Sequence, residues 1–469
     1  MREPTTSTRA RFLGRTLCWT LAALAISSHA QGTGADGALV EKGRQLALAA
    51  DCAACHTAPA GGPAFAGGYG IASPLGTVYS SNITPSTKNG IGDYTLEDFS
   101  RALRQGVRKD GAHLYPAMPY TAYTRLSDDD TAALYAYFMK SVTAVDRPAP
   151  TTGLPFPFNI RASMAVWNAL FLDDRRFAPD AARSAQWNRG AYLVDALAHC
   201  STCHSPRNVL MGERGDALLA GGSVGSWYAP NITSDANSGI GAWSGAELVQ
   251  YLKTGHVHDK AQAAGPMAEA IENSLQHLPD ADLEAIATYL KAVPARAGGE
   301  SRPRFAWGEA SDSERSQRGL KAADAGWRVF SGSCSQCHQP DGTGNANYPS
   351  LFHNTASGAD RPDNVVSTIL LGVSRNVAAG PSFMPAFGDH ASYVDRLSDQ
   401  EIADVSNYVF ARYGNAAVKV SAADVAVLRK GGRPTLLARL RPLAAPGLVL
   451  LAALVVFGVS LRLRRQRRH

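Results

Sequence analysis

The sequence predicts a mainly α-helical protein that consists of three tandem domains and one C-terminal transmembrane helix. The chain has 469 residues, a length that suits about three domains. A five-residue pattern, Cys-x-x-Cys-His, occurs at Cys52–His56, Cys200–His204 and Cys334–His338. Apolar residues recur at helical spacing around each copy. Residues 442–461 form an uncharged run of the length needed to cross a bilayer.

The repeated pattern is the attachment signature of c-type haem. Each thiol adds to one vinyl group of the porphyrin, and the adjoining histidine lies close enough to bind the iron. The sequence therefore predicts three covalent haem c groups. The attachment residues are Cys52, Cys55, Cys200, Cys203, Cys334 and Cys337, and the iron-binding histidines are His56, His204 and His338.

A redox disulfide and a zinc knuckle are the alternatives for a Cys-x-x-Cys pair. Zinc sites usually combine two pairs that are close in sequence, whereas these pairs lie more than a hundred residues apart. A thioredoxin-like pair belongs in a βαβ pattern, which the sequence does not show. Repetition of the full pattern favours haem.

The two ends of the chain carry most of its net charge of +6. Residues 1–30 contribute +3 and residues 462–469 contribute +5, so the remainder carries −2. A nearly neutral globular part gives no indication of nucleic-acid binding. No nucleic-acid partner is expected.

Both ends predict export and membrane attachment. Four arginines, the short apolar run 17–26 and Ser28-His29-Ala30 predict a signal peptide over residues 1–30. The apolar run 442–461 precedes five arginines, which place the C-terminal tail in the cytoplasm. We expect the haem domains on the periplasmic side of the inner membrane. A buried core helix is the alternative for residues 442–461.

Internal repetition indicates that the first two domains are copies. Asn82-Ile83-Thr84 recurs 149 residues later as Asn231-Ile232-Thr233, while the third domain keeps only the order of elements. The predicted divisions are the signal peptide 1–30, cytochrome c domain 1 at 31–146, a Pro-rich joint at 147–184, domain 2 at 185–296, a linker at 297–312, domain 3 at 313–418, a juxtamembrane segment at 419–441, the transmembrane helix 442–461 and a basic tail at 462–469.

Three helices are expected in each domain. The first leads into the haem motif and contains a glycine: 39–50 with Gly43, 188–199 with Gly190, and 319–333 with Gly326. The middle helix ends at Gly106, Gly255 or Gly372, the residue type expected beyond a helix end. Capping boxes are predicted at Thr95/Asp98, Ser244/Glu247, Ser127/Asp130 and Ser398/Glu401. Tyr137, Tyr289 and Tyr408 are expected to pack the last helix on the first.

A methionine follows each middle-helix glycine by twelve residues. These are Met118, Met267 and Met384, each beside a proline that stiffens its loop. Three methionines in this register predict thioether ligands on the second side of each iron, as in class I cytochrome c-like domains. His256 and His258 compete with Met267 for the second site. His/Met ligation suits an electron carrier and leaves no open position on the iron for a substrate.

Prolines after the motifs are candidates for orienting the iron-binding histidines. The carbonyl of Pro349, or of Pro74 in the first domain, is suited to accept the free ring N–H of its histidine. An ordinary loop proline is the alternative. Arg207 is either a partner of a haem propionate or a solvated side chain.

The chain resembles the three-haem cytochrome c subunits of bacterial membrane-bound periplasmic dehydrogenases. The stretches that carry the resemblance are Ser81–Pro85, Leu114–Tyr120, Asn188–Val194, Ala263–Met267 and Tyr348–Asn354, within residues 38–430. The resemblance implies an electron-transfer subunit without catalytic residues. It also implies a flavin- or PQQ-dependent catalytic partner that oxidises an alcohol, sugar or sugar acid, and ubiquinone or another respiratory acceptor. The motifs do not choose among alcohol, gluconate, sorbitol and glucose dehydrogenases.

Two other functions remain open at this point. One is a tethered carrier between a quinol-oxidising complex and a terminal oxidase. The other is a multihaem enzyme such as a peroxidase, which needs one haem with an open iron position.

Overall fold

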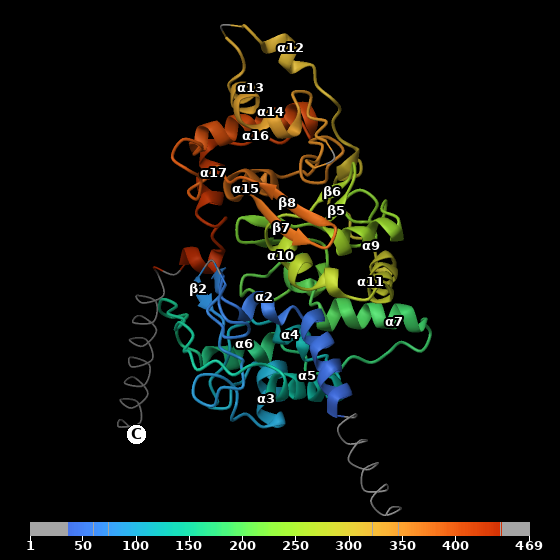
Figure 1. Ribbon diagram of the computed structural model, residues 1–469, viewed down its shortest axis with the longest axis vertical. Helices are drawn as coiled ribbons and strands as arrows, with labels where there is room; N and C mark the ends of the chain where they lie inside the picture. The colour runs from blue at the N-terminus through green and yellow to red at the C-terminus, as the bar shows by residue number, and fades with distance from the viewer. Residues whose placement is uncertain are drawn as a thin grey trace, which may run out of the picture.

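The computed structural model describes residues 36–440 and 442, apart from 60, 74, 321 and 346. The predicted signal peptide, the basic tail and all but Pro442 of the predicted transmembrane helix lie outside these residues. In Figure 1 the chain runs from blue at the lower end through green and yellow to orange at the top. The stretches around the first, second and third Cys-x-x-Cys-His motif are called the first, second and third segment. Among the described residues, no helix combines the length and apolar character needed to cross a membrane.

Each segment contains a helix that leads into the motif, the motif turn, a middle helix and a last helix, with short hairpins at different places. The first contains a helix over 36–49, α2 (Cys52–His56), β1 (Gly70–Ser73), β2 (Gly76–Tyr79), α3 (Leu96–Gln105), α4 (Tyr120–Tyr123) and α5 (Asp128–Lys140). The second contains α7 (Ala185–Tyr192), η1 (Leu193–Leu197), α8 (Ser201–His204), η2 (Gly215–Ala217), β3 (Gly222–Val224), β4 (Trp227–Ala229), α9 (Gly245–Thr254), β5 (His256–Val257), β6 (Ala261–Gln262), α10 (Gly265–Asn273), η3 (Leu275–His277) and α11 (Asp280–Ala292). After η4 (Arg304–Ala306), the third contains α12 (Ser313–Gln317), α13 (Ala325–Val329), η5 (Phe330–Cys334), α14 (Ser335–His338), α15 (Asp363–Leu371), β7 (Val373–Val377), β8 (Gly380–Met384), α16 (Asp399–Tyr413) and α17 (Ala422–Arg429).

Local sequence signals set most helix ends as predicted. Reciprocal capping boxes begin α3 at Thr95, α9 at Ser244 and α16 at Ser398. Gly106 and Gly255 end α3 and α9 with φ of 64° and 71°, a left-handed conformation that glycine adopts without strain. The predicted helix ends are therefore confirmed there.

The predicted box at Ser127 is only half formed. The Ser127 side chain accepts the Asp130 N–H, but the Asp130 carboxylate does not return to the Ser127 backbone. It accepts instead from the Tyr192 hydroxyl at 2.5 Å and pairs with Lys42 at 2.7 Å. A tertiary contact with the second segment thus replaces the local hydrogen bond.

The helices before the second and third motifs differ from the prediction. Each changes from α-helix to a π-helical turn, at Leu193–Leu197 shortly before Cys200 and at Phe330–Cys334, which includes the first motif cysteine. The third helix also starts at Ala325 rather than Gly319, because Asp324 caps it by accepting the Trp327 N–H. Gly319 itself has a φ of 84°, which does not belong to a right-handed helix.

A close glycine contact joins the first and last helices of every segment. A Cβ at Gly43 would lie 2.0 Å from the Ala133 oxygen, one at Gly190 1.9 Å from the Ala285 oxygen, and one at Gly326 2.2 Å from the Asp404 oxygen. The last helix also places a tyrosine against each glycine, four residues after the residue that carries this oxygen. These tyrosines are Tyr137, Tyr289 and Tyr408. The predicted tyrosine contact between these helices is confirmed.

The hydrophobic core does not divide evenly among the segments. One cluster runs through the first two segments, from Leu46 and Leu134 to Leu193 and Ile286. A second cluster, around Phe330, Ile402 and Phe410, belongs to the third segment. The first two segments therefore fold on a shared core.

The predicted Pro-rich joint forms a helix, α6 (Ser163–Phe171), that links the first two segments. The Trp167 indole donates to the Leu210 carbonyl at 2.9 Å, and the Asn168 amide donates to the Gln105 carbonyl at 2.9 Å. The joint therefore docks one segment on the next, while Val166 and Leu170 on α6 stay exposed.

Candidate haem-attachment sites

Each Cys-x-x-Cys-His motif forms one short helical turn, in α2, α8 and α14. Residues three apart on such a turn lie on the same face, which places the two thiols of each pair side by side. All six cysteines are free. Among the described residues, no group of three or more His, Cys, Asp or Glu is placed to hold a metal ion.

Thiol acidity argues against a redox disulfide at these motifs. Burial raises the pKa of the Cys52, Cys200 and Cys334 thiols to about 12. Thiols that exchange disulfides have lowered pKa values, because the thiolate is the nucleophile. These three thiols therefore lack the acidity of a disulfide-exchange site.

A backbone carbonyl orients each motif histidine. Nδ1 of His56 lies 2.7 Å from the Ser81 oxygen, Nδ1 of His204 2.6 Å from the Pro230 oxygen, and Nδ1 of His338 3.0 Å from the Pro349 oxygen. A carbonyl accepts only a protonated Nδ1, so Nε2 is left as the free ligand atom. Burial lowers the pKa of all three imidazoles, which keeps them neutral for iron binding. The residues present fit a haem iron.

The prediction for Pro349 is confirmed. In the first segment the accepting carbonyl belongs to Ser81, not to Pro74, which lies outside the described residues. The sequence prediction was wrong at this position and missed Pro230 altogether. The sequence repeat could have indicated both acceptors as equivalent positions. Ser81 and Pro230 lie 149 residues apart, and each directly precedes an Asn-Ile-Thr sequence.

The Asn-Ile-Thr sequence fixes the accepting carbonyl in place. The Asn82 side-chain oxygen accepts from the Thr84 N–H at 2.9 Å and from the Thr84 hydroxyl at 2.7 Å. Asn231 accepts from Thr233 in the same way, at 2.8 and 2.7 Å. Both asparagine amides also donate to the chain that follows the last helix, at Val145 and Arg296. The repeated sequence thus holds the loop that faces the histidine.

The three methionines all follow the middle helix of their segment, but they lie in different local structures. Met118 lies in the loop between α3 and α4, Met267 in the first turn of α10, and Met384 at the end of β8. Each is partly buried against a hydrophobic cluster. β5 and β6, and likewise β7 and β8, form the hairpin that leads from the helix-ending glycine to the methionine. Their role as second iron ligands remains a prediction.

The two histidines near Met267 have different surroundings. His258 is exposed, with Nδ1 3.1 Å from the Asp259 carboxylate. His256 is half-buried on β5, and its buried Nδ1 has no hydrogen-bond partner. Of the two histidines, His256 is therefore the stronger alternative to Met267 as the second ligand of this iron.

Arg207 supports the second motif from within the chain. Its guanidinium donates to the Thr202 carbonyl at 2.5 Å and to the Met211 carbonyl at 3.3 Å, and lies 3.7 Å from Glu213. Its side chain is 23% exposed and therefore not simply solvated, while the propionate role remains a prediction. It holds the motif loop to the loop that follows.

Contacts between the motifs place the second segment in the middle. The Tyr123 hydroxyl donates to the Ala50 carbonyl beside the first motif at 2.8 Å, and its ring meets that of His199 beside the second at 5.6 Å. The third segment contacts the second through Ser367, which donates to the Ser226 carbonyl at 2.7 Å. The second motif therefore adjoins the first, and its segment adjoins the third.

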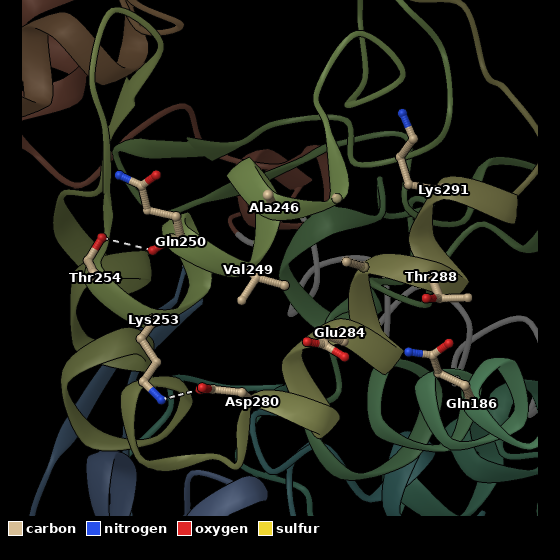
Figure 2. A pocket seen from close by; sticks show the side chains of 12 residues that line it. Gln186, Ala246, Val249, Gln250, Lys253, Thr254, Asp280, Glu284, Thr288 and Lys291 are labelled. Carbon is tan, nitrogen blue, oxygen red and sulfur yellow. Dashed lines mark hydrogen bonds and ion pairs between the residues drawn. The ribbon is translucent and has the colours of Figure 1, made fainter.

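The hollow shown in Figure 2 lies apart from the motifs. α9 and α11 line it, together with Gln186, and Lys253 pairs with Asp280 across one end at 2.5 Å. Its other charged residues are Glu284 and Lys291. None of the predicted attachment or ligand residues lines this hollow.

Helical turns with paired thiols and a carbonyl-bound histidine define the chain as a c-type cytochrome. The Cytochrome c family matches residues 40–142 and 323–410, and cytochrome c domains carry covalently bound haem c. The fructose dehydrogenase cytochrome subunit of Gluconobacter japonicus is 48% identical over 450 residues, 92% of each chain. The chain belongs to the family of cytochrome c subunits of bacterial dehydrogenases.

Two further relatives support this assignment. The cytochrome c subunit of the quinone alcohol dehydrogenase of Gluconobacter oxydans is 40% identical, covering 89% of this chain and 88% of the relative. The gluconate 2-dehydrogenase cytochrome c subunit of Pantoea cypripedii is 40% identical, covering 84% and 90%. This chain is accordingly an electron-transfer subunit of a dehydrogenase complex and not its catalytic subunit.

Proposed function

We propose that this chain is a membrane-tethered periplasmic cytochrome with three covalent haem c groups, which carries electrons from a partner dehydrogenase to ubiquinone. The observation that carries the proposal is the recurrence of one geometry at three motifs, with a carbonyl within 3.0 Å of each histidine Nδ1. The haems supply one-electron chemistry. The chain supplies their attachment, their histidine ligands and, at Met118, Met267 and Met384, their second ligands.

The partner is proposed to oxidise an alcohol, a sugar or a sugar acid with a flavin or PQQ cofactor. The relative named for fructose dehydrogenase is 48% identical to this chain, and those named for alcohol and gluconate dehydrogenases are each 40% identical. A flavin-dependent fructose or polyol dehydrogenase is therefore our first choice.

Substrate-dependent reduction of the haems tests this function. In anaerobic membranes that contain the full complex, fructose or a related polyol should reduce the haem c absorption bands. Deletion of the partner dehydrogenase should abolish that reduction, and dithionite should still reduce the haems as a control. Reduction by quinol alone, with no response to sugars, alcohols or sugar acids, would identify a carrier fed by a quinol-oxidising complex instead.

The proposed tether predicts that the chain becomes soluble when it ends at Arg441. Removal of the apolar run 442–461 takes away about twenty residues that would cross the bilayer. The shortened protein should appear in the periplasmic fraction with the mass of three added haems. Retention in the membrane pellet after a salt wash would show that another segment anchors the chain.

A further inference from the structure

The helix between the first two segments has an apolar side that the described residues leave uncovered. α6 (Ser163–Phe171) contacts the two segments through Trp167 and Asn168. Its exposed residues are Ser163, Ala165, Val166, Ala169 and Leu170. The exposed side of a helix in a soluble protein is normally polar or charged, whereas this one offers a single hydroxyl group and no charge. The outer side of α6 therefore has the composition of a buried surface.

Neighbouring residues extend this apolar surface. The Ile160 carbonyl accepts from the Ser163 N–H at 3.0 Å, which joins the preceding turn directly to α6. In the second segment the Leu210 carbonyl accepts from the Trp167 indole at 2.9 Å, which brings its loop against the helix. Six large apolar side chains on these stretches are 44% to 66% exposed: Phe156, Ile160, Val166, Leu170, Val209 and Leu210. We call these six residues the apolar patch.

The joint that carries most of the apolar patch is almost free of charge. Between Pro148 and Leu172 the chain has one charged residue, Arg161. Its guanidinium lies 4.5 Å from the centre of the Tyr115 ring and donates to the His113 carbonyl at 2.9 Å. The one charge of this stretch is therefore engaged with the first segment.

The end of the described chain brings a bilayer close to this side of the protein. The last described helix carries Leu436 and Leu440, which lie one turn apart and are 53% and 47% exposed. The uncharged run 442–461 follows at once, so the bilayer that it is proposed to cross begins at this point of the chain. Figure 1 shows this end of the described chain on the left, on the same side as β2 and α6.

Charge and composition favour lipid as the occupant of the apolar patch. Residues 430–442 contain no Asp or Glu, and Lys430 and Arg439 are exposed. The joint 147–184 has five arginines and three aspartates, a net charge of +2. Anionic headgroups attract such basic stretches. The core of a protein–protein interface is instead enriched in Tyr, Trp and Arg, and the apolar patch contains none of these.

We propose that the apolar patch lies on the membrane surface, as a second contact of the chain with the bilayer. The inference rests on the proposed C-terminal tether. Apolar side chains of a surface helix enter the boundary between headgroups and acyl chains, while basic residues beside them stay with the headgroups. The contact thus places the joint between the first two segments against the lipid.

This second contact acts on orientation more than on attachment. One small apolar element binds a membrane weakly and reversibly, and stable anchoring takes two signals. The chain that ends at Arg441 should therefore still leave the membrane. A tether alone leaves the haem domains free to turn about one point. The apolar patch determines which side of the first two segments faces the membrane.

Photolabelling from within the lipid tests this contact. The purified complex, with its partner subunit, is placed in vesicles of phosphatidylcholine and phosphatidylglycerol that carry a diazirine in the upper acyl chain. After irradiation, mass spectrometry of the digested chain should find lipid adducts in residues 156–170 and 209–210 as well as in 442–461. Tyr393 and Val394 should remain unlabelled, although they are 93% and 87% exposed.

A double variant, Val166→Asp with Leu170→Asp, provides the matched comparison. Both side chains are exposed, so the fold should not change. The variant should lose the adducts on α6 and keep those in 442–461, whereas Val394→Asp should keep both. Adducts in 442–461 without adducts on wild-type α6 would overturn the proposal and assign the apolar patch to water or to the partner subunit. Absence of adducts in 442–461 would instead overturn the proposed tether.

Discussion

Replacement of Met384 by alanine should lower the midpoint potential of one haem and leave that haem covalently attached. Cys334 and Cys337 hold the porphyrin independently of the second iron ligand, so the haem content should not change. A thioether ligand opposite histidine raises the reduction potential, since it favours the ferrous iron. We expect the midpoint to fall by at least about 59 mV, which corresponds to a tenfold change for one electron.

The hairpin geometry sharpens this prediction. Met384 pairs with Val373, directly after Gly372, so the sulfur is carried by a short and well-defined strand pair. Redox titration should show a lower midpoint potential for one haem. The weak Met–iron absorption band should lose one third of its intensity. Met164→Ala is the matched control, because Met164 lies on α6 outside the register of the three methionines. Three unchanged midpoints in Met384→Ala would show that another group binds this iron.

His256 makes the second site a separate case. Its buried Nδ1 has no partner, and it lies on the hairpin that leads to Met267. If Met267 is the ligand, Met267→Ala lowers the second midpoint and His256→Ala does not. The reverse result would assign the second iron to two histidines.

Much of this arrangement could be predicted because its signals are local. The glycine-to-methionine spacing predicts that Met118, Met267 and Met384 follow the middle helix of each segment, and the structure places them there. Capping boxes depend on residues three positions apart, and those at Thr95, Ser244 and Ser398 are formed as predicted. At Ser127 the same signal failed, because Asp130 is engaged by Tyr192 from another segment.

The remaining features depend on contacts that leave little trace in the sequence. A backbone carbonyl has no characteristic side chain, so the acceptors at Ser81 and Pro230 emerged only from the structure. Nothing in the sequence indicates that Arg375 is buried, because its burial depends on packing of the second segment against its hairpin. The shared core of the first two segments is likewise a tertiary property. Repetition predicts equivalent positions, but it does not predict what lies between the copies.

The glycine in each motif-leading helix should be essential for stability, and Gly190 gives the sharpest test. A Cβ at this position would lie 1.9 Å from the Ala285 oxygen and 2.8 Å from the Tyr289 Cβ, so α7 and α11 would have to separate. Tyr289 donates to Asp195 at 2.7 Å across the same contact. Overpacking a buried contact costs about 1–3 kcal/mol, and we expect Gly190→Ala to reach the upper part of that range.

Gly245→Ala is the matched control for this effect. Gly245 is the first residue of α9 in the same segment, and nothing lies within 4 Å of the position that its Cβ would take. Alanine is the better helix former, so this change should be neutral or stabilising by up to about 1 kcal/mol. Denaturant unfolding of the haem-loaded proteins should therefore give a lower free energy of unfolding for Gly190→Ala. For Gly245→Ala the free energy of unfolding should be unchanged or higher. Equal stability of Gly190→Ala and the wild type would show that the first and last helices are not held at this close distance. The glycine would then not be needed to place the haem motif.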